Sequence, residues 1–153
     1  MTETSALEPS DWPVTVEASI SPAGHAAVLS GLIGYNEQAA GPGRHAPIAV
    51  YVRGPDATIV GGLEGRTSYC WLIIELVFLP EACRGQRVGA RVLRQAEEEA
   101  VRRGCHGARL DTASFQARGF YEKQGYAVFG ELDLGSGGHR LFFMHKDLRA
   151  AAA

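Results

Sequence analysis

The sequence predicts a mixed α/β fold, an α+β arrangement of one sheet and flanking helices, in a single domain. Strand-like and helix-like segments alternate in the middle of the chain, whereas its ends contain strand pairs joined by turns. The chain has 153 residues, of which 46% are hydrophobic and 21% are charged. That composition supplies enough apolar material for one sizeable core.

The first half of the chain is expected to form a strand, a helix and three further strands. Apolar residues alternate through Val14–Ile20, as in a strand with one buried face. Ser21 suits a helix cap and Pro22 the first helical position, while the Gly41-Pro42-Gly43 break ends that helix. Gly54-Pro55-Asp56 has the composition of a turn. The predicted elements are strand Val14–Ile20, helix Pro22–Gln38, and strands Ile48–Val52, Thr58–Leu63 and Trp71–Leu79.

The second half contains the clearest element, a helix that begins at Val88. The segment before it, Trp71–Leu79, is nearly all apolar, which predicts a central strand buried on both faces. The helix has an apolar stripe on one side and charges spaced four residues apart on the other, and Gly104 ends it. Ser114 is expected to cap a further short helix. The predicted ion pairs are Arg94–Glu98, Glu98–Arg102 and Glu99–Arg103, and the remaining elements are strand Ala108–Leu110, helix Phe115–Lys123, and strands Tyr126–Leu132 and His139–Lys146.

Composition and charge exclude several classes of partner. A net charge of -2 argues against binding nucleic acid through bulk positive charge. The longest apolar run, Cys70–Pro80, is interrupted by Glu75 and is too short to span a membrane. Three cysteines without CxxC spacing predict reduced thiols and a cytoplasmic protein, and no signal peptide is visible. The five histidines lack ligand spacing, so we expect no metal site.

These signals also set the expected domain boundaries. Residues 1–12 are polar and acidic and are predicted to be a flexible tail. Residues 13–148 are predicted to form one domain, and residues 149–153 a frayed C-terminus.

The segment Leu79–Ala90 is the most informative part of the sequence. It enters the helix with Arg84 and Arg87 rather than with a capping or acidic residue. Positive side chains at the positive end of a helix dipole are unfavourable unless an anion binds there. Gly85 and Gly89 let the backbone approach such an anion closely. The segment therefore predicts a phosphate cradle.

Two motifs give the chain a family resemblance. Arg84-Gly-Gln-Arg-Val-Gly-Ala90 lies between a central strand and a helix, and Ala117-Arg-Gly-Phe-Tyr121 leads to Gly125-Tyr126. In this order the motifs resemble those of the GNAT superfamily of acetyl-CoA-dependent N-acetyltransferases, over roughly residues 14–148. The resemblance implies a central, mixed, mostly antiparallel sheet of six to seven strands flanked by helices. One departure is Arg87, where the family pattern has glycine; its side chain either points away from the cradle or bonds the phosphates itself.

The resemblance also implies a binding site for acetyl-CoA as a cosubstrate. The pyrophosphate would bind the N–H groups of residues 86–90, and the pantetheine arm would pair with the backbone of residues 77–79. In the family an Asn often touches the cofactor at the position of Ser114, although a helix cap explains Ser114 equally well. The expected cofactor-binding residues are Val77, Phe78, Leu79, Arg84, Gly85, Gln86, Arg87, Val88, Gly89, Ala90, Ser114, Ala117 and Tyr121.

Two residues are candidates for the proton transfers of amine acetylation. Tyr121 matches the family's usual acid, which protonates the departing thiolate; the alternative is an aromatic residue that only packs. Glu75 interrupts an apolar strand, where an unpaired buried carboxylate is costly and its pKa would rise. It is either the base that deprotonates the amine or the partner of a structural arginine.

Other residues near the expected acceptor site can also be explained by structural roles alone. Asp111 is more simply explained as a cap for the turn that follows it. His139 lies near the last hairpin and is more simply a surface histidine. Residues 35–37 lie where similar enzymes often bind acceptors, but the sequence does not define their role.

The leading functional hypothesis is an N-acetyltransferase that moves an acetyl group from acetyl-CoA to a primary amine of a small molecule. The amine would attack the thioester directly, through a tetrahedral intermediate. The alternatives are a protein lysine or N-terminal acetyltransferase and a non-catalytic acetyl-CoA-binding sensor. Enzymes of this kind are often dimers, so a homodimer is a possible assembly.

Overall fold

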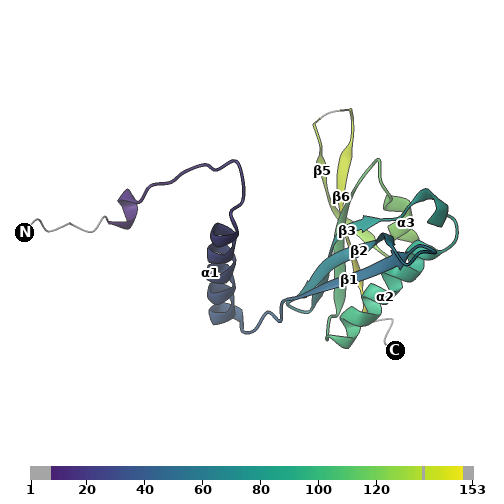
Figure 1. Cartoon of the computed structure of the whole chain (residues 1–153), viewed down its shortest axis with the longest axis horizontal. Coiled ribbons are helices and arrows are strands. Elements are labelled where there is room, and N and C mark those ends of the chain that lie inside the picture. The colour runs from purple at the N-terminus through teal and green to yellow at the C-terminus, as the bar shows by residue number, and fades with distance from the viewer. Residues whose placement is uncertain (1–7, 136, 150–153) are drawn as a thin grey trace, which may run out of the picture. The chain divides into compact units, whose positions relative to one another are not determined.

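The computed structural model describes residues 8–135 and 137–149, and the chain divides into two units, Met1–Gly41 and Pro42–Ala153. The first unit contains the 3₁₀ turn η1 (Pro9–Asp11) and helix α1 (Pro22–Ala40). The second contains all the strands of the described residues (Figure 1). Its elements are β1 (Ala46–Arg53), β2 (Ile59–Ser68), β3 (Trp71–Phe78), η2 (Glu81–Cys83), α2 (Val88–Arg102), β4 (Gly107–Ala113), α3 (Arg118–Lys123), β5 (Ala127–Asp133) and β6 (Arg140–Asp147).

The first unit confirms the predicted helix but not the predicted strand. The Oγ atom of Ser21 accepts a hydrogen bond from the Gly24 N–H at 3.0 Å, and Gly41 follows the last turn with a φ of 76°. Val14–Ile20 forms no strand and is exposed, with Val16 at 102% of its reference area. An alternating pattern becomes a strand only where a neighbour pairs with its backbone, and no described segment pairs with this one.

Both predicted chain ends lie partly outside the described residues. Residues 1–7 of the predicted tail are not described, and the next residues form η1. Residues 150–153 of the predicted frayed end are not described either, and Arg149 pairs with Asp147 at 2.6 Å. The single domain predicted for residues 13–148 stays a prediction.

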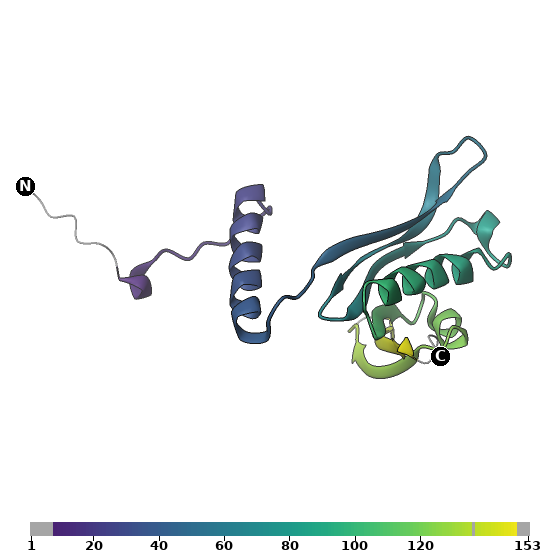
Figure 2. The same ribbon diagram turned by 90° about the horizontal axis from the view of Figure 1, so that it is seen from below.

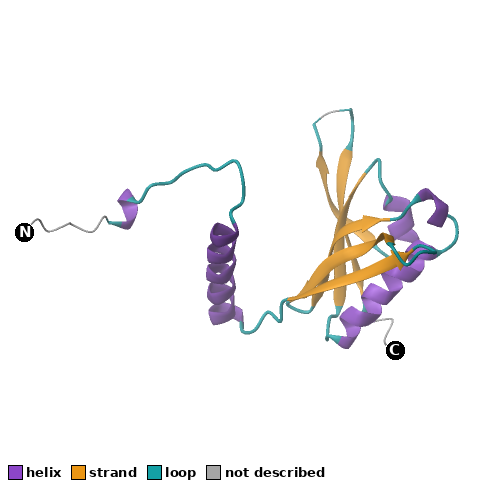
Figure 3. Ribbon diagram, in the orientation of Figure 1, coloured by secondary structure: helices purple, strands orange, loops and turns teal. Residues whose placement is uncertain are grey.

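The second unit contains a six-stranded mixed sheet in the order β1-β2-β3-β4-β6-β5. Figure 3 shows its strands in orange. Four neighbouring pairs are antiparallel, and β3–β4 is the parallel pair. Helix α2 makes the crossover that a parallel connection requires. The mixed α/β class is confirmed, with six strands.

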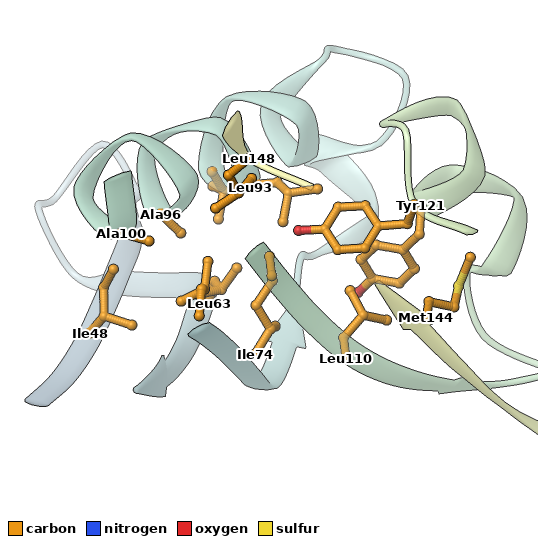
Figure 4. Packing of buried hydrophobic residues seen from close by; sticks show 14 of the residues in the cluster. Ile48, Leu63, Ile74, Leu93, Ala96, Ala100, Leu110, Tyr121, Met144 and Leu148 are labelled. Carbon is orange, nitrogen blue, oxygen red and sulfur yellow. The ribbon is translucent and has the colours of Figure 1, made fainter. Parts of the chain in front are cut away.

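The core lies on one face of the sheet, where α2 and α3 cover it (Figure 2). The predicted apolar stripe of α2 is buried except for Val101, which is partly buried. It belongs to one core cluster with strand residues such as Leu63, Leu72 and Met144, each at most 1% exposed. Burying a side chain of this size stabilises the fold by about 1.5–3 kcal/mol. Figure 4 shows these helix and strand residues interdigitating.

The charged side of α2 differs from the prediction in one pair. Arg94 pairs with Glu98 at 3.9 Å, and Glu99 pairs with both Arg102 and Arg103 at 2.7 Å. Arg102 therefore binds Glu99 in place of Glu98. Gly104 follows the helix with a φ of 85°, as expected for its end. No helix in the described ranges is long and apolar enough to cross a membrane.

Candidate active site

Strands β3 and β4 pair over three residues and then separate. Trp71–Ile73 pairs with Gly107–Arg109, and within the described residues the two strands do not pair beyond Ile73. A bulge at Glu75 lies just beyond this pairing, because its two neighbours in β3 pair with consecutive residues of β2. The edge of β3 that faces β4 is therefore without a strand partner after Ile73.

The separation exposes the end of β3. Leu76, Val77 and Phe78 have 64%, 38% and 64% of their surface exposed. The prediction that Trp71–Leu79 is buried on both faces is wrong for this part of the strand. Free N–H and C=O groups on a strand edge can pair with an extended ligand that carries amide groups. Val77 and Phe78 lie on this edge, and Leu79 follows it.

The loop from β3 to α2 is open to an anion. Arg84, Gln86 and Arg87 are exposed, and Gly85 has a φ of 71° with open space around it. The Gln86 side chain donates to the Ala82 carbonyl at 3.0 Å. Helix α2 has neither a side-chain cap nor an acidic residue in its first turn. Its first N–H groups and the two arginines thus suit a negatively charged group such as a phosphate.

Arg87 has the backbone conformation that usually requires glycine. It is the N-cap residue of α2, with a φ of 60° and a ψ of 12° in the left-handed region. That region costs an ordinary residue about 1–2 kcal/mol. The conformation accounts for the glycine in the resembled pattern, and the arginine occupies it at this cost.

Gly89 brings the start of α2 against its neighbours. A Cβ atom on Gly89 would lie 3.2 Å from Cδ1 of Leu79 and 3.2 Å from Cζ of Phe120. Gly89 therefore lies close both to Leu79 and to Phe120 of α3. Ala117 is the N-cap of that helix, and its N–H donates to Thr112 Oγ1 at 3.4 Å.

Tyr121 is the buried residue of α3, with 7% of its surface exposed. Figure 4 shows Tyr121 among the residues of the core cluster. Burial raises the pKa of the Tyr121 phenol above its usual value. The phenol therefore stays protonated at neutral pH and is able to donate a proton.

Glu75 is not buried, contrary to the sequence-based expectation. Its side chain is 44% exposed and forms an ion pair with Arg66 of β2. The two side chains share the sheet face opposite the core, because Leu72 and Ile74 point into the core. The sequence left open whether Glu75 is a catalytic base or the partner of a structural arginine. The structure supplies the arginine partner, Arg66. The carboxylate is nevertheless exposed, so a substrate can also reach it.

Neither Ser114 nor Asp111 forms the cap that was predicted for it after β4. Ala113 N–H donates to Gln116 Oε1 at 2.7 Å, while Ser114 Oγ accepts from the Arg140 N–H at 3.2 Å. Ser114 thus contacts the β5–β6 hairpin, and α3 begins at Arg118 rather than Phe115. Asp111 lies within β4 opposite Phe143, so it is a strand residue rather than a turn cap.

Sequence reasoning missed one polar cluster, formed by Glu97, Tyr126 and Lys146. Glu97 is 9% exposed and accepts hydrogen bonds from the other two side chains. One signal was available: Glu97 falls on the apolar stripe of α2, four residues after Leu93. Among the described residues as a whole, no group of three or more His, Cys, Asp or Glu side chains has the arrangement of a metal site.

Comparison with known proteins agrees with this geometry. Residues 21–126 match the sequence profile of the acetyltransferase (GNAT) family. The chain is 37% identical over 120 residues to acetyltransferase Atu2258 of Agrobacterium fabrum, covering 78% of this chain and 88% of that protein. It is 37% identical over 81 residues to blasticidin-S acetyltransferase of Streptomyces morookaense, covering 52% of this chain and 60% of that protein.

Solved structures share the fold. A crystal structure of a protein from Agrobacterium tumefaciens is 32% identical, with a TM-score of 0.82 over 89% of this chain and 99% of that one. An aminoglycoside 6'-N-acetyltransferase solved with coenzyme A is 18% identical, with a TM-score of 0.59 over 67% of this chain and 73% of that one. The sequence matches decide the family. The chain belongs to the acetyltransferase (GNAT) family and is an acyltransferase enzyme.

Proposed function

We propose that this enzyme transfers an acetyl group from acetyl-CoA to a primary amine of a small molecule. The observation that carries the proposal is the free edge of β3, which leads directly into the arginine- and glycine-containing start of α2. An extended ligand with amides next to a phosphate group matches both features, and the pantetheine arm and pyrophosphate of acetyl-CoA have that arrangement. The distant neighbour solved with coenzyme A supports the same choice.

The chain's residues divide the binding between them. Backbone groups of Val77 and Phe78 pair with the amides of the pantetheine arm. The first N–H groups of α2, with Arg84 and Arg87, hold the pyrophosphate. An N–H of the same strand edge donates to the carbonyl oxygen that becomes negative, a contribution of ~3–4 kcal/mol in comparable sites.

Tyr121 and Glu75 carry out the proton transfers. The amine nitrogen bonds to the acetyl carbon, the carbon–sulfur bond breaks, the nitrogen loses a proton and the sulfur gains one. Glu75 accepts the proton from the amine, directly or through water. Tyr121 donates a proton to the sulfur and is reprotonated from solvent before the next turnover.

The acceptor is proposed to be a small cationic amine. Glu75 and Asp111 lie on exposed positions of neighbouring strands, on the sheet face away from α2. Carboxylates there attract an ammonium group, which must lose its proton before attack. The relative named for blasticidin-S supports an amine of the antibiotic class.

A thiol-release assay with acetyl-CoA tests the proposal. The acceptors are polyamines, antibiotic amines, amino acids and peptides, and the variants are Tyr121→Phe and, as a matched control, Tyr51→Phe. We expect release with a small amine, a loss of kcat of about a hundredfold in Tyr121→Phe, and little change in the control. Release with peptides alone would show a protein acetyltransferase, and acetyl-CoA binding without release would show a sensor; either result overturns the proposal.

A further inference from the structure

A buried cluster of three polar side chains lies next to Tyr121 and joins three segments of the chain. The Tyr126 hydroxyl donates to Glu97 Oε1 at 2.9 Å, and Lys146 Nζ donates to Glu97 Oε2 at 2.7 Å. Lys146 Nζ also lies 5.7 Å from the centre of the Tyr126 ring. Glu97 belongs to α2, Lys146 to β6, and Tyr126 to the segment between α3 and β5. Each oxygen of the carboxylate thus binds a different element.

The cluster is buried where a core normally excludes charge. The side chains of Glu97 and Lys146 are 11% and 21% exposed, and Tyr126 is 3% exposed. A buried ion pair gives little net stability, but removing one partner strands the other charge and is strongly destabilising. Apolar side chains would fill the same volume at no such cost, so the cluster calls for a role beyond filling space.

Tyr126 is in direct contact with Tyr121. Their rings meet edge to face with centres 5.9 Å apart, and the Tyr126 N–H donates to the Tyr121 carbonyl at 3.0 Å. Phe120, which touches Gly89 at the start of α2, is 5.1 Å from the Tyr121 ring on another side. The Tyr126 hydroxyl is fixed to α2 through Glu97. The position of the Tyr121 ring relative to α2 therefore depends on this hydrogen bond.

We propose that Glu97, Tyr126 and Lys146 form a positioning cluster that holds the Tyr121 hydroxyl at the departing sulfur. This proposal rests on the proposed function, in which Tyr121 donates that proton. The cluster does not touch the reacting atoms; it fixes α3 against α2, the helix whose first turn holds the pyrophosphate. Proton transfer is sensitive to such placement, since a shift of about 1 Å can cost a hundredfold in rate.

The first test is Tyr126→Phe, which keeps the ring and removes its bond to Glu97. We expect kcat to fall about tenfold, with the KM for acetyl-CoA changed less than about twofold, because only placement in the transition state is lost. Glu122→Gln is the matched control, because it removes the exposed Arg118–Glu122 pair, at 2.8 Å, from α3, the helix that carries Tyr121. An unchanged kcat in Tyr126→Phe, with the fold intact by circular dichroism, overturns the proposal.

A double-mutant cycle separates positioning from general stability. If Tyr126 acts through the Tyr121 hydroxyl, adding Tyr126→Phe to Tyr121→Phe should change kcat by less than about twofold. A full further tenfold loss would show a role independent of Tyr121 and would overturn the proposal. Lys146→Arg, which keeps the positive charge at Glu97, should retain most of the activity that Lys146→Met loses.

The same cycle distinguishes this proposal from the proposed function. If Tyr121→Phe has normal kcat, Tyr121 is not the acid, and both the acid assignment and the positioning cluster fail. If Tyr121→Phe is slow while Tyr126→Phe is normal, the acid assignment stands and only the cluster fails.

Discussion

Glu75 shows what a single residue reveals in sequence and what it does not. A charge within an apolar strand was visible as an anomaly, and the structure places it at the bulge where β3 leaves β4. Its partner Arg66 was not predictable, because the pairing depends on the register of β2 against β3. For the same reason Glu97 was detectable from its place on α2, whereas its partners from β6 and the α3–β5 segment were not.

The two roles of Glu75 predict different mutant behaviour. Glu75→Gln should lower kcat by about a hundredfold if the carboxylate accepts the amine proton. Its melting temperature should change little, because an exposed ion pair contributes at most about 1 kcal/mol. Arg66→Gln is the matched control, because it breaks the same pair and leaves the carboxylate in place. Equal losses of kcat in the two variants would show that only the ion pair matters.

Tyr126 makes stability depend on pH in the alkaline range. Burial and the Glu97 carboxylate raise the pKa of Tyr126 well above its usual value. The unfolded chain releases this proton near pH 10 and the folded chain retains it, so the unfolded state binds fewer protons at higher pH. The free energy of unfolding should therefore decrease as pH rises above about 10. Urea titrations from pH 8 to 11 should show a shallower decrease in Tyr126→Phe, and equal slopes would contradict the shift.

At the scale of elements, locally determined structure was predictable. The apolar stripe of α2 fixes its buried face through helical periodicity alone, and Ser21 caps α1 as expected. The strand predicted at Val14–Ile20 failed because pairing is not local. Ser114 failed as a cap because the hairpin residue Arg140 donates to its hydroxyl instead. The exposed end of β3 was missed because sequence does not show where two parallel strands separate.

The start of α2 yields a prediction about Arg87. Arg87→Gly should raise the free energy of unfolding by roughly 0.5–1 kcal/mol, because glycine adopts the left-handed conformation without strain. If the guanidinium bonds the pyrophosphate, the Kd for acetyl-CoA should rise about fivefold for a partly exposed charged contact. Arg87→Ala removes the same charge and keeps the strain, so it should bind equally weakly without the gain in stability. Unchanged or tighter binding by Arg87→Gly would show that the side chain points away from the cradle.

At the scale of the whole molecule, the fold class was predictable because it follows from the order of elements. The family match runs from residue 21 to 126 and so spans both units, whereas every residue of the core cluster lies in the second unit. Most of the proposed cofactor-binding residues lie between Val77 and Ala90, and a site built from neighbouring residues can be proposed from a sequence motif. The proposed acceptor residues Glu75 and Asp111 lie on different strands, and the pairing of strands in the sheet, which the sequence does not show, decides how close they come.

The net charge of the chain has the same sign as that of acetyl-CoA, the proposed cosubstrate, which gives a final prediction. The net charge is -2, so we expect a polyanion such as acetyl-CoA to be attracted only locally, by Arg84 and Arg87 at the start of α2. Both side chains are exposed, and salt screens exposed charges over a length that falls below about 5 Å near 0.5 M. The Kd for acetyl-CoA, measured by calorimetry, should rise about tenfold between low salt and about 0.5 M. Arg84→Gln should weaken binding at low salt and flatten this dependence, whereas Arg149→Gln, which changes an exposed arginine paired with Asp147, should leave the slope unchanged. A salt dependence that is the same in all three proteins would mean that the arginines of the loop do not hold the phosphates.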